Sequence, residues 1–120
     1  MAVYYRGSEI KFSIALTAQG FSMDDDDFDI EVRGQKGSIK GNKNNTTGDS
    51  NIVIFREPAL DDDSSDSEPS EGTWFAIIST DPLSTGDMEV IGTAYIPDSN
   101  APDGIRTDLA KTTLGNLKNI

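Results

Sequence analysis

The strongest constraint on the fold of this chain is a regular alternation of apolar and polar residues in two short stretches. In residues 8–16 and again in residues 27–33, every second residue is a large apolar one. Successive side chains of a β-strand point to opposite faces, so this period of two predicts strands with one face in a core. The apolar positions are Ile10, Phe12, Ile14 and Leu16 in the first stretch and Phe28, Ile30 and Val32 in the second.

Further stretches also have the character of strands. Residues 51–56 and 73–79 contain unbroken apolar runs, which predict central strands covered on both faces. Residues 87–97 alternate again, and Gly92 interrupts them in the way that a β-bulge or a close approach of another segment would. The remaining predicted strands are short and comprise residues 36–40 and 105–109.

The composition favours strands over helices. Ile and Val together outnumber Leu by 16 to 6, and 11 Gly and 5 Pro interrupt the chain frequently. β-Branched residues fit a pleated, half-buried surface better than a helix. The pattern closest to a helix, residues 109–117, is weakened by Thr112, Thr113 and Gly115. We therefore predict an all-β protein, a single immunoglobulin-like β-sandwich of six or seven strands that spans residues 1–120.

Charge and residue usage exclude several classes of function. The chain has neither cysteine nor histidine, which rules out disulfides, Cys/His zinc sites, thiol nucleophiles and imidazole bases. Its 21 acidic and 10 basic residues give a net charge of −11, which repels nucleic acid. No apolar run approaches the ~20 residues that span a bilayer, and no signal peptide is recognisable. We expect no nucleic-acid or membrane partner, and we expect the chain to be made in a cytoplasm.

Most of the acidic residues lie in two segments, residues 21–31 and residues 57–72. The second is predicted to be a solvated loop insertion, because it cannot bury enough surface to offset its ordering entropy. In the first, Asp24, Asp26 and Asp29 are candidate calcium ligands, since hard cations bind several carboxylate oxygens. Both segments lack the Gly and the closing Glu of an EF-hand. We therefore expect solvated loops and no cofactor, with a calcium-dependent carbohydrate- or receptor-binding module as the alternative.

Residues 41–50 form a second kind of loop, rich in Asn and nearly uncharged. Residues 44–47 contain two overlapping Asn-x-Thr sequons. Without a secretory signal, they predict only a polar loop between strands.

The acidic residues do not suggest an enzyme. They occur in polar loops and at outward strand positions, where nothing raises the pKa of a carboxyl for acid catalysis. Tyr4, Tyr5 and Arg6, by contrast, are residue types enriched at protein–protein interfaces. An equally good interpretation is that Tyr4 or Tyr5 closes one end of the core. The functions that remain for the chain use its exposed faces and edge strands to bind other proteins.

Three stretches of the sequence are informative when taken together. They are Tyr5-Arg6-Gly7-Ser8-Glu9-Ile10-Lys11-Phe12 at the start, residues 20–32 in the middle, and residues 95–107 near the end. The set resembles small Ig-like virion structural proteins of tailed bacteriophages that infect gut Bacteroidetes, including crAss-like phages. The opening stretch also resembles the start of the N-terminal domain of phage baseplate upper proteins.

This resemblance implies a non-enzymatic structural protein located in the virion. The implied roles are a capsid auxiliary or decoration protein and an adaptor for head or tail fibres. In either role the chain would be present in many copies and dock onto phage capsid or tail and fibre proteins. The edge strands and chain ends would supply the contacts.

Overall fold

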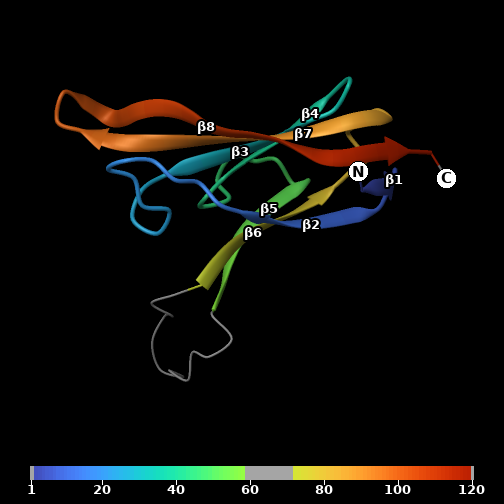
Figure 1. The fold of residues 1–120 in the computed structure, drawn as a ribbon, viewed down its shortest axis with the longest axis horizontal. Coiled ribbons are helices and arrows are strands. Elements are labelled where there is room, and N and C mark those ends of the chain that lie inside the picture. Colours follow the sequence, from blue (N-terminus) through green and yellow to red (C-terminus); the bar gives the residue numbers. More distant parts are fainter. Residues whose placement is uncertain (1, 59–71, 120) are drawn as a thin grey trace.

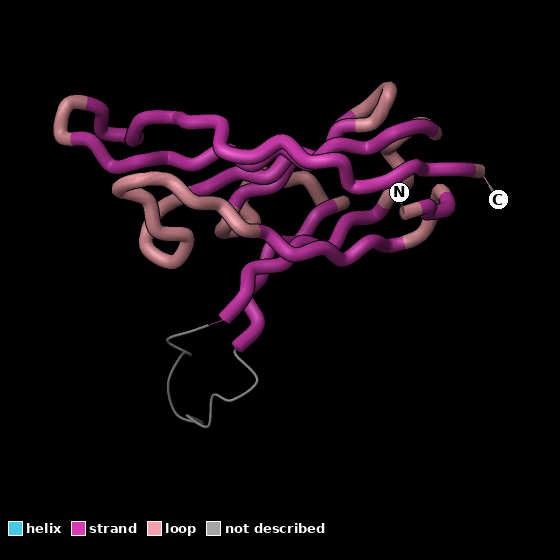
Figure 2. Tube along the Cα trace, in the orientation of Figure 1, coloured by secondary structure: helices cyan, strands magenta, loops and turns pink. Residues whose placement is uncertain are grey.

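A computed structural model describes residues 2–58 and 72–119, apart from the side chains of residues 58, 101–103 and 105–110. These residues form strands and connecting loops (Figure 2). None of them belongs to a helix that is long and apolar enough to cross a membrane. The strands form two sheets that lie face to face, so the prediction of an all-β sandwich is confirmed (Figure 1).

The larger sheet has five strands in the order β1-β8-β7-β3-β4. They are β1 (Val3–Tyr5), β3 (Phe28–Arg33), β4 (Ser38–Asn42), β7 (Gly86–Asp98) and β8 (Ala101–Lys118). The smaller sheet has the order β2-β6-β5. Its strands are β2 (Glu9–Ile14), β5 (Ile52–Pro58) and β6 (Gly72–Ser79). All pairings are antiparallel except that of β1 with β8. The described residues thus contain eight strands, whereas the sequence predicted six or seven.

One hydrophobic core lies between the two sheets. The alternating residues that the sequence assigned to an inner face are buried there, apart from Phe12, which is half-buried against the core. Fully burying a side chain such as Phe28 or Ile30 contributes about 1.5–3 kcal/mol relative to leaving it exposed. The period of two therefore identified the main contributors to stability. The buried members are Ile10, Ile14, Leu16, Phe28, Ile30 and Val32.

Two glycines of the larger sheet allow the smaller sheet to pack closely on it. A Cβ atom at Gly92 would overlap the side chain of Leu16, and one at Gly41 would overlap Ile52. The β7–β8 pairing also shifts register between Gly92 and Thr93. Gly92 therefore marks both a bulge and a close approach, the two alternatives that its position in the sequence indicated.

The prediction that residues 51–56 and 73–79 are central strands covered on both faces is wrong. β5 is an edge strand, because its only sheet neighbour in the described residues is β6. β6 is central, but the larger sheet covers only one face of the three-stranded sheet. Every second apolar side chain of these two runs consequently lies on an outer face.

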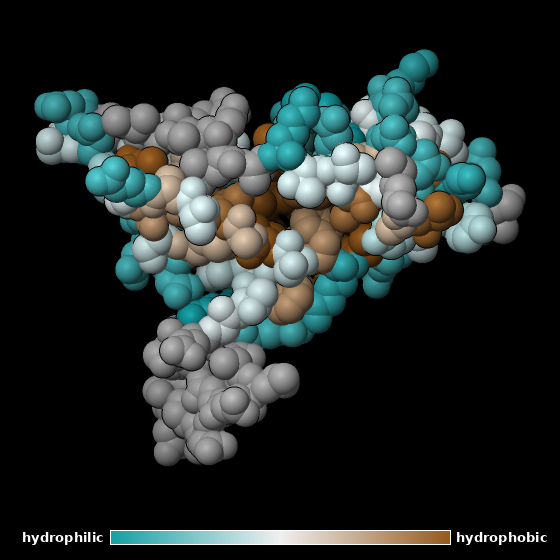
Figure 3. Space-filling model, in the orientation of Figure 1, coloured by the Kyte–Doolittle hydropathy of each residue, from teal (hydrophilic) through white to brown (hydrophobic). Residues whose placement is uncertain are grey.

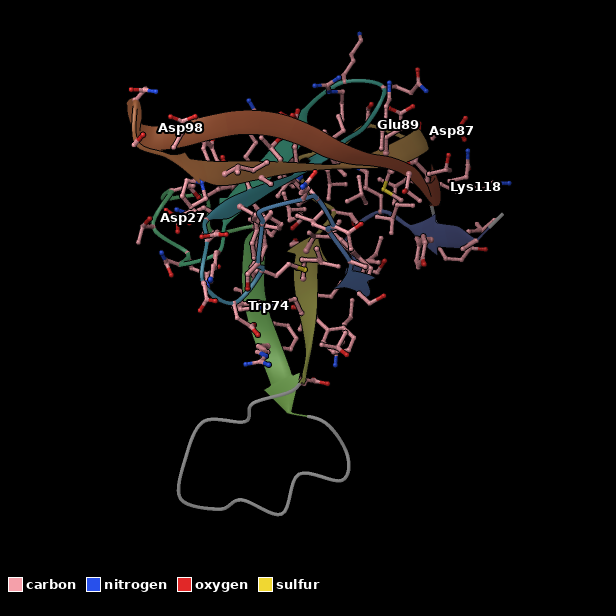
Figure 4. The ribbon with its side chains drawn as sticks, turned by 60° about the vertical axis from the view of Figure 1, so that its left-hand side comes forward. Asp27, Trp74, Asp87, Glu89, Asp98 and Lys118 are labelled. Carbon is pink, nitrogen blue, oxygen red and sulfur yellow. The ribbon has the colours of Figure 1, made fainter. Side chains whose placement is uncertain are left out.

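The last strand is much longer than the predicted residues 105–109. β8 includes residues 109–117, the stretch that came closest to a helical pattern, and pairs with β7 along nearly its whole length. The ladder satisfies the backbone of this stretch, and tertiary pairing thereby overrides its weak helical spacing. Figure 4 shows Asp98 at one end of the β7–β8 hairpin and Lys118 at the other.

Both ends of the predicted acidic loop insertion, residues 57–72, belong to strands. Glu57 and Pro58 belong to β5, and Gly72 belongs to β6, where Glu57 pairs with Thr73 and Pro58 with Gly72. The rest of the predicted insertion, residues 59–71, lies outside the described residues.

Candidate docking surfaces

The structure separates the three residues that the sequence proposed for partner binding. Tyr4 is half-buried and packs against the core, with its ring against Gly115. Tyr5 is 53% exposed. The Arg6 side chain is exposed, and its guanidinium donates to the backbone carbonyl of Asp81 (3.3 Å). Tyr4 therefore closes one end of the core, which leaves Tyr5 and Arg6 as the surface residues of this group.

The three candidate calcium ligands each have a different protein partner. Asp24 accepts a hydrogen bond from the Trp74 indole N–H (2.9 Å) and pairs with Arg56 (3.2 Å). The carboxylate of Asp26 accepts from the backbone N–H of Ser22 (2.9 Å). The carboxylate of Asp29 accepts from the Tyr95 hydroxyl (2.7 Å).

A lysine brings a second positive charge to this acidic loop, in addition to Arg56. The Lys43 ammonium donates to the backbone carbonyls of Asp24 and Asp26 and lies 5.6 Å from the centre of the Trp74 ring. Trp74 in turn packs edge-on against Phe28 at the margin of the core. Among the side chains that the structure describes, no three acidic groups come together in a way that could hold a metal ion.

The outer face of the three-stranded sheet carries an apolar patch. Val53 and Phe55 of β5 lie directly opposite Ile77 and Phe75 of β6 in the antiparallel register. The two phenyl rings stack with their centres 5.8 Å apart, and Val53 is 50% exposed. We call Val53, Phe55, Phe75 and Ile77 the outer apolar face. Such a contiguous patch is typical of a protein–protein contact surface.

A cation lies over this face. The Lys11 ammonium is 4.5 Å from the centre of the Phe75 ring and 5.4 Å from that of Phe55, and it pairs with Glu57 (2.6 Å). Since both members of the ion pair are nearly half exposed, the pair itself contributes little to stability. Lys11 and Glu57 therefore place an ion pair beside the outer apolar face.

One side of the sandwich is closed by residues 43–51, which connect β4 to β5 and which we call the capping loop. The Asn45 side chain accepts a hydrogen bond from the Ile54 N–H and donates one to the Ile54 carbonyl, both at 2.8 Å. Asn45 has a positive φ of 56°, a conformation that Asn tolerates better than most residues. Its amide thus occupies the place of a neighbouring strand on β5.

The capping loop covers the edge of β4 in the same way. The Lys40 N–H donates to the Asp49 carboxylate (3.1 Å), and the Thr47 hydroxyl donates to the Lys40 carbonyl (3.4 Å). Burial tends to raise the pKa of Asp49, but the N–H groups of Asn51 and Lys40 hold it below its ordinary value. The loop therefore satisfies edge positions of both sheets.

The opposite side of the sandwich is open. There a cleft of about 280 Å³ lies between β2 and the strands β7 and β8. Figure 3 shows apolar side chains gathered in the hollow between the two sheets. The cleft is lined mainly by apolar and hydroxyl-bearing residues, among them Phe12, Ile14, Leu16, Ile30, Val90 and Leu114.

Sequence reasoning missed the outer apolar face and the capping loop. The face was hidden because an unbroken apolar run does not tell whether one or both sides of a strand are covered. The capping role depends on which backbone groups Asn45 and Asp49 reach across the sandwich. The one local signal was the density of Asn, Thr and Asp, whose short side chains readily bond to backbone groups.

Comparison with protein-family models, with curated proteins and with solved structures finds no match for this chain.

Proposed function

We propose that this chain is a non-enzymatic structural protein of a bacteriophage virion, either a capsid auxiliary or decoration protein or an adaptor for head or tail fibres. It acts by docking onto phage capsid or tail and fibre proteins in many copies. The virion part of the proposal depends on the sequence resemblance, and the docking part on the surface of the sandwich.

The observation that carries the docking role is the outer apolar face. Two stacked phenyl rings and two aliphatic side chains lie together on the outer side of the smaller sheet, where Val53 is exposed and the other three side chains are half-buried. Exposing such a patch has a cost in solubility, which the net charge of −11 offsets. Large aromatic side chains are also enriched at the centres of protein interfaces. A modest affinity per copy suffices when many copies dock on one particle.

Counting this chain in purified particles tests the proposal. Particles of the phage that encodes the chain are purified on a density gradient, and the chain is quantified against the major capsid protein by mass spectrometry. We expect a fixed, stoichiometric number of copies per particle. Particles that are complete and infectious without the chain would overturn the proposal.

Two exposed valines form a matched pair for locating the docking surface. Val53 is 50% exposed on the outer apolar face, and Val3 is 48% exposed on β1. Val53→Glu places a charge among apolar groups, and we expect it to lower incorporation into particles at least tenfold. Val3→Glu should be incorporated as the unchanged chain is. Equal incorporation of two variants that melt like the unchanged chain would exclude the outer apolar face as the docking surface.

The same preparation separates the calcium-dependent alternative from the docking role. Melting is followed with millimolar calcium and with a chelator. Since Asp24, Asp26 and Asp29 each have another protein partner, we expect the same melting temperature in both conditions. A melting temperature that rises with calcium would favour the alternative.

A further inference from the structure

Among the described residues, the smaller sheet has no strand beside the free edge of β2. In an immunoglobulin sandwich the sheet equivalent to β2-β6-β5 carries a fourth strand, which pairs with the strand equivalent to β2. In the described residues β2 pairs only with β6. The place of the fourth strand is therefore open along β2.

The hydrogen-bonding pattern shows which groups of β2 face this open place. The Ser8 carbonyl accepts from the Thr80 N–H, so alternate residues from Ser8 onward bond to β6. The intervening residues direct their N–H and C=O groups away from β6. Those residues are Glu9, Lys11 and Ser13. A row of outward donors and acceptors is what an added strand requires.

The open side also has a place for the side chains of an added strand. The cleft beside β2 reaches from Phe12 and Leu16 to Thr112 and Leu114 on β8, with Ile30 among its lining residues. Its lining contains no charged side chain. A strand paired with β2 would direct every second side chain toward this cleft, and apolar side chains fit its lining.

The chain itself places a strand on part of this side. β1 pairs with β8 at Asn116, Leu117 and Lys118. The Asn116 N–H donates to the Ala2 carbonyl, and the Lys118 carbonyl accepts from the Arg6 N–H. For the rest of its length, the only strand that pairs with β8 in the described part of the chain is β7. β1 therefore fills this side of the sandwich only beside the C-terminal end of β8, and the rest of this side is open.

In the part of the chain that the structure describes, the edge strands on the closed side, β4 and β5, are capped by loop side chains, whereas β2 is not. The capping loop satisfies Ile54 on β5 and Lys40 on β4 with side chains. No comparable cap is found on Lys11 or Ser13 of β2 among the described residues. A free edge is normally protected against pairing, so an edge left open beside an apolar cleft is suited to a partner.

A second folded copy of the chain does not fit this place. Ile10 and Ile14, the apolar residues of its own free edge strand that could insert, are buried in its core and are not available. Two copies would also bring together two molecules of charge −11. The occupant must therefore be a segment that is extended before it binds and that carries no net negative charge.

We propose that the open side of the sandwich binds an extended segment of another protein by β-strand addition to β2, with apolar side chains at alternate residues inserted into the cleft. The segment is neutral or basic overall. This inference goes beyond the proposed virion role and does not depend on the outer apolar face.

A synthetic peptide tests strand addition directly on the full chain. The probe is Lys-Thr-Val-Thr-Ile-Thr-Val-Thr-Lys with blocked ends and a fluorescent dye, long enough at ~3.3 Å per residue to follow the edge of β2. We expect saturable binding by fluorescence anisotropy, with a Kd of about 10–100 μM. The first control has the same composition with its three apolar residues contiguous. The second has N-methyl groups on alternate backbone nitrogens that would pair with β2. Both should bind at least tenfold more weakly.

Variants of the chain locate the binding site. Ser13→Pro removes an N–H that faces the open side and leaves the β2–β6 hydrogen bonds in place, so it should weaken binding at least tenfold. Ser13→Ala keeps the N–H and should bind as the unchanged chain does. Thr112→Trp, at an exposed position that lines the cleft, should compete for the same space without disturbing the core. It provides an independent test if Ser13→Pro fails to fold.

Several outcomes would overturn the inference. Equal binding of the alternating and N-methylated peptides would show that the peptide binds through its apolar side chains alone, without backbone hydrogen bonds to β2. No saturable binding, or binding unaffected by Ser13→Pro in a chain that melts normally, would exclude pairing with β2. Self-association that Ser13→Pro abolishes would identify a second copy as the occupant. None of these outcomes changes the number of copies expected in particles, so the two proposals fail independently.

Discussion

The two long sides of this sandwich treat their edge strands in opposite ways. On one side the capping loop bonds to the backbone of β4 and β5 through Thr47, Asp49 and Asn45. On the other side, backbone groups of β2 have no hydrogen-bond partner among the described residues and lie beside an apolar cleft. Both sides belong to one core and one chain. The difference shows that a few loop side chains, rather than the strands themselves, decide which edge of a sandwich is available.

On each side a large aliphatic side chain packs against a glycine of the facing sheet. The two side chains differ in how completely the surrounding residues enclose them. On the closed side Ile52 lies against Gly41, and on the open side Leu16 lies against Gly92. All four residues are buried. Leu16 also lines the cleft, whereas Ile52 does not. A side chain beside a cleft has space in which its neighbours can rearrange.

The largest expected effect is a difference between truncations of these two residues. Ile52→Ala should lower the free energy of unfolding by about 4 kcal/mol, because the closed side cannot collapse around the cavity. Leu16→Ala should cost about 2–3 kcal/mol, because the residues around the open cleft can move into the space left by the truncated side chain. Urea unfolding of the two variants at neutral pH measures both values. If Leu16→Ala were the more destabilising variant, the two sides would not differ in enclosure.

The next effect tests the cap on β5. Asn45→Gly removes two hydrogen bonds to Ile54 and should lower the free energy of unfolding by about 1–2 kcal/mol. Gly accepts the positive φ at this position, so the loss reports the side chain and not backbone strain.

Uncovering this edge should also promote self-association, which sedimentation velocity measures. The exposed neighbour Asn44 provides the control, and Asn44→Gly should change neither stability nor association. A monomeric, fully stable Asn45→Gly variant would mean that the cap has no protective role.

The smallest effect concerns the pH dependence of the closed side. The pKa of Asp49 is lowered in the folded state, so the stability it contributes is complete above its unfolded pKa of about 3.9. That contribution is lost as the pH falls through the lower, folded pKa. Asp49→Asn should therefore cost less than about 1 kcal/mol at neutral pH.

The difference between Asp49→Asn and the unchanged chain should shrink as the pH falls below about 4. Thermal melting from pH 6 to pH 2.5 checks this. A difference that stays constant over this range would show that the charge of Asp49 is irrelevant to the cap.

Most of the sandwich could be predicted from local patterns. The alternation of Ile10, Phe12 and Ile14 fixed one face of β2, since a shift of one residue would expose the whole set. Gly92 was recognisable as a bulge or a close approach, because a glycine inside a strand usually marks one of the two. The candidate site was less accessible to prediction. Tyr4 and Tyr5 are adjacent and chemically alike, and only the pairing of β1 with β8 places one inward and the other outward.

The sequence by itself determined that the chain forms strands, that one core lies between them, and which alternating residues of segments 8–16 and 27–33 face it. These properties follow from the period of the side chains, which is local. Only the tertiary structure decided that Phe55 and Phe75 face outward, that residues 109–117 join β8, and which edges are covered. Coverage depends on contacts between residues distant in the sequence, such as Lys11 with Phe75 or Leu16 with Gly92. No local pattern records whether another segment reaches a strand.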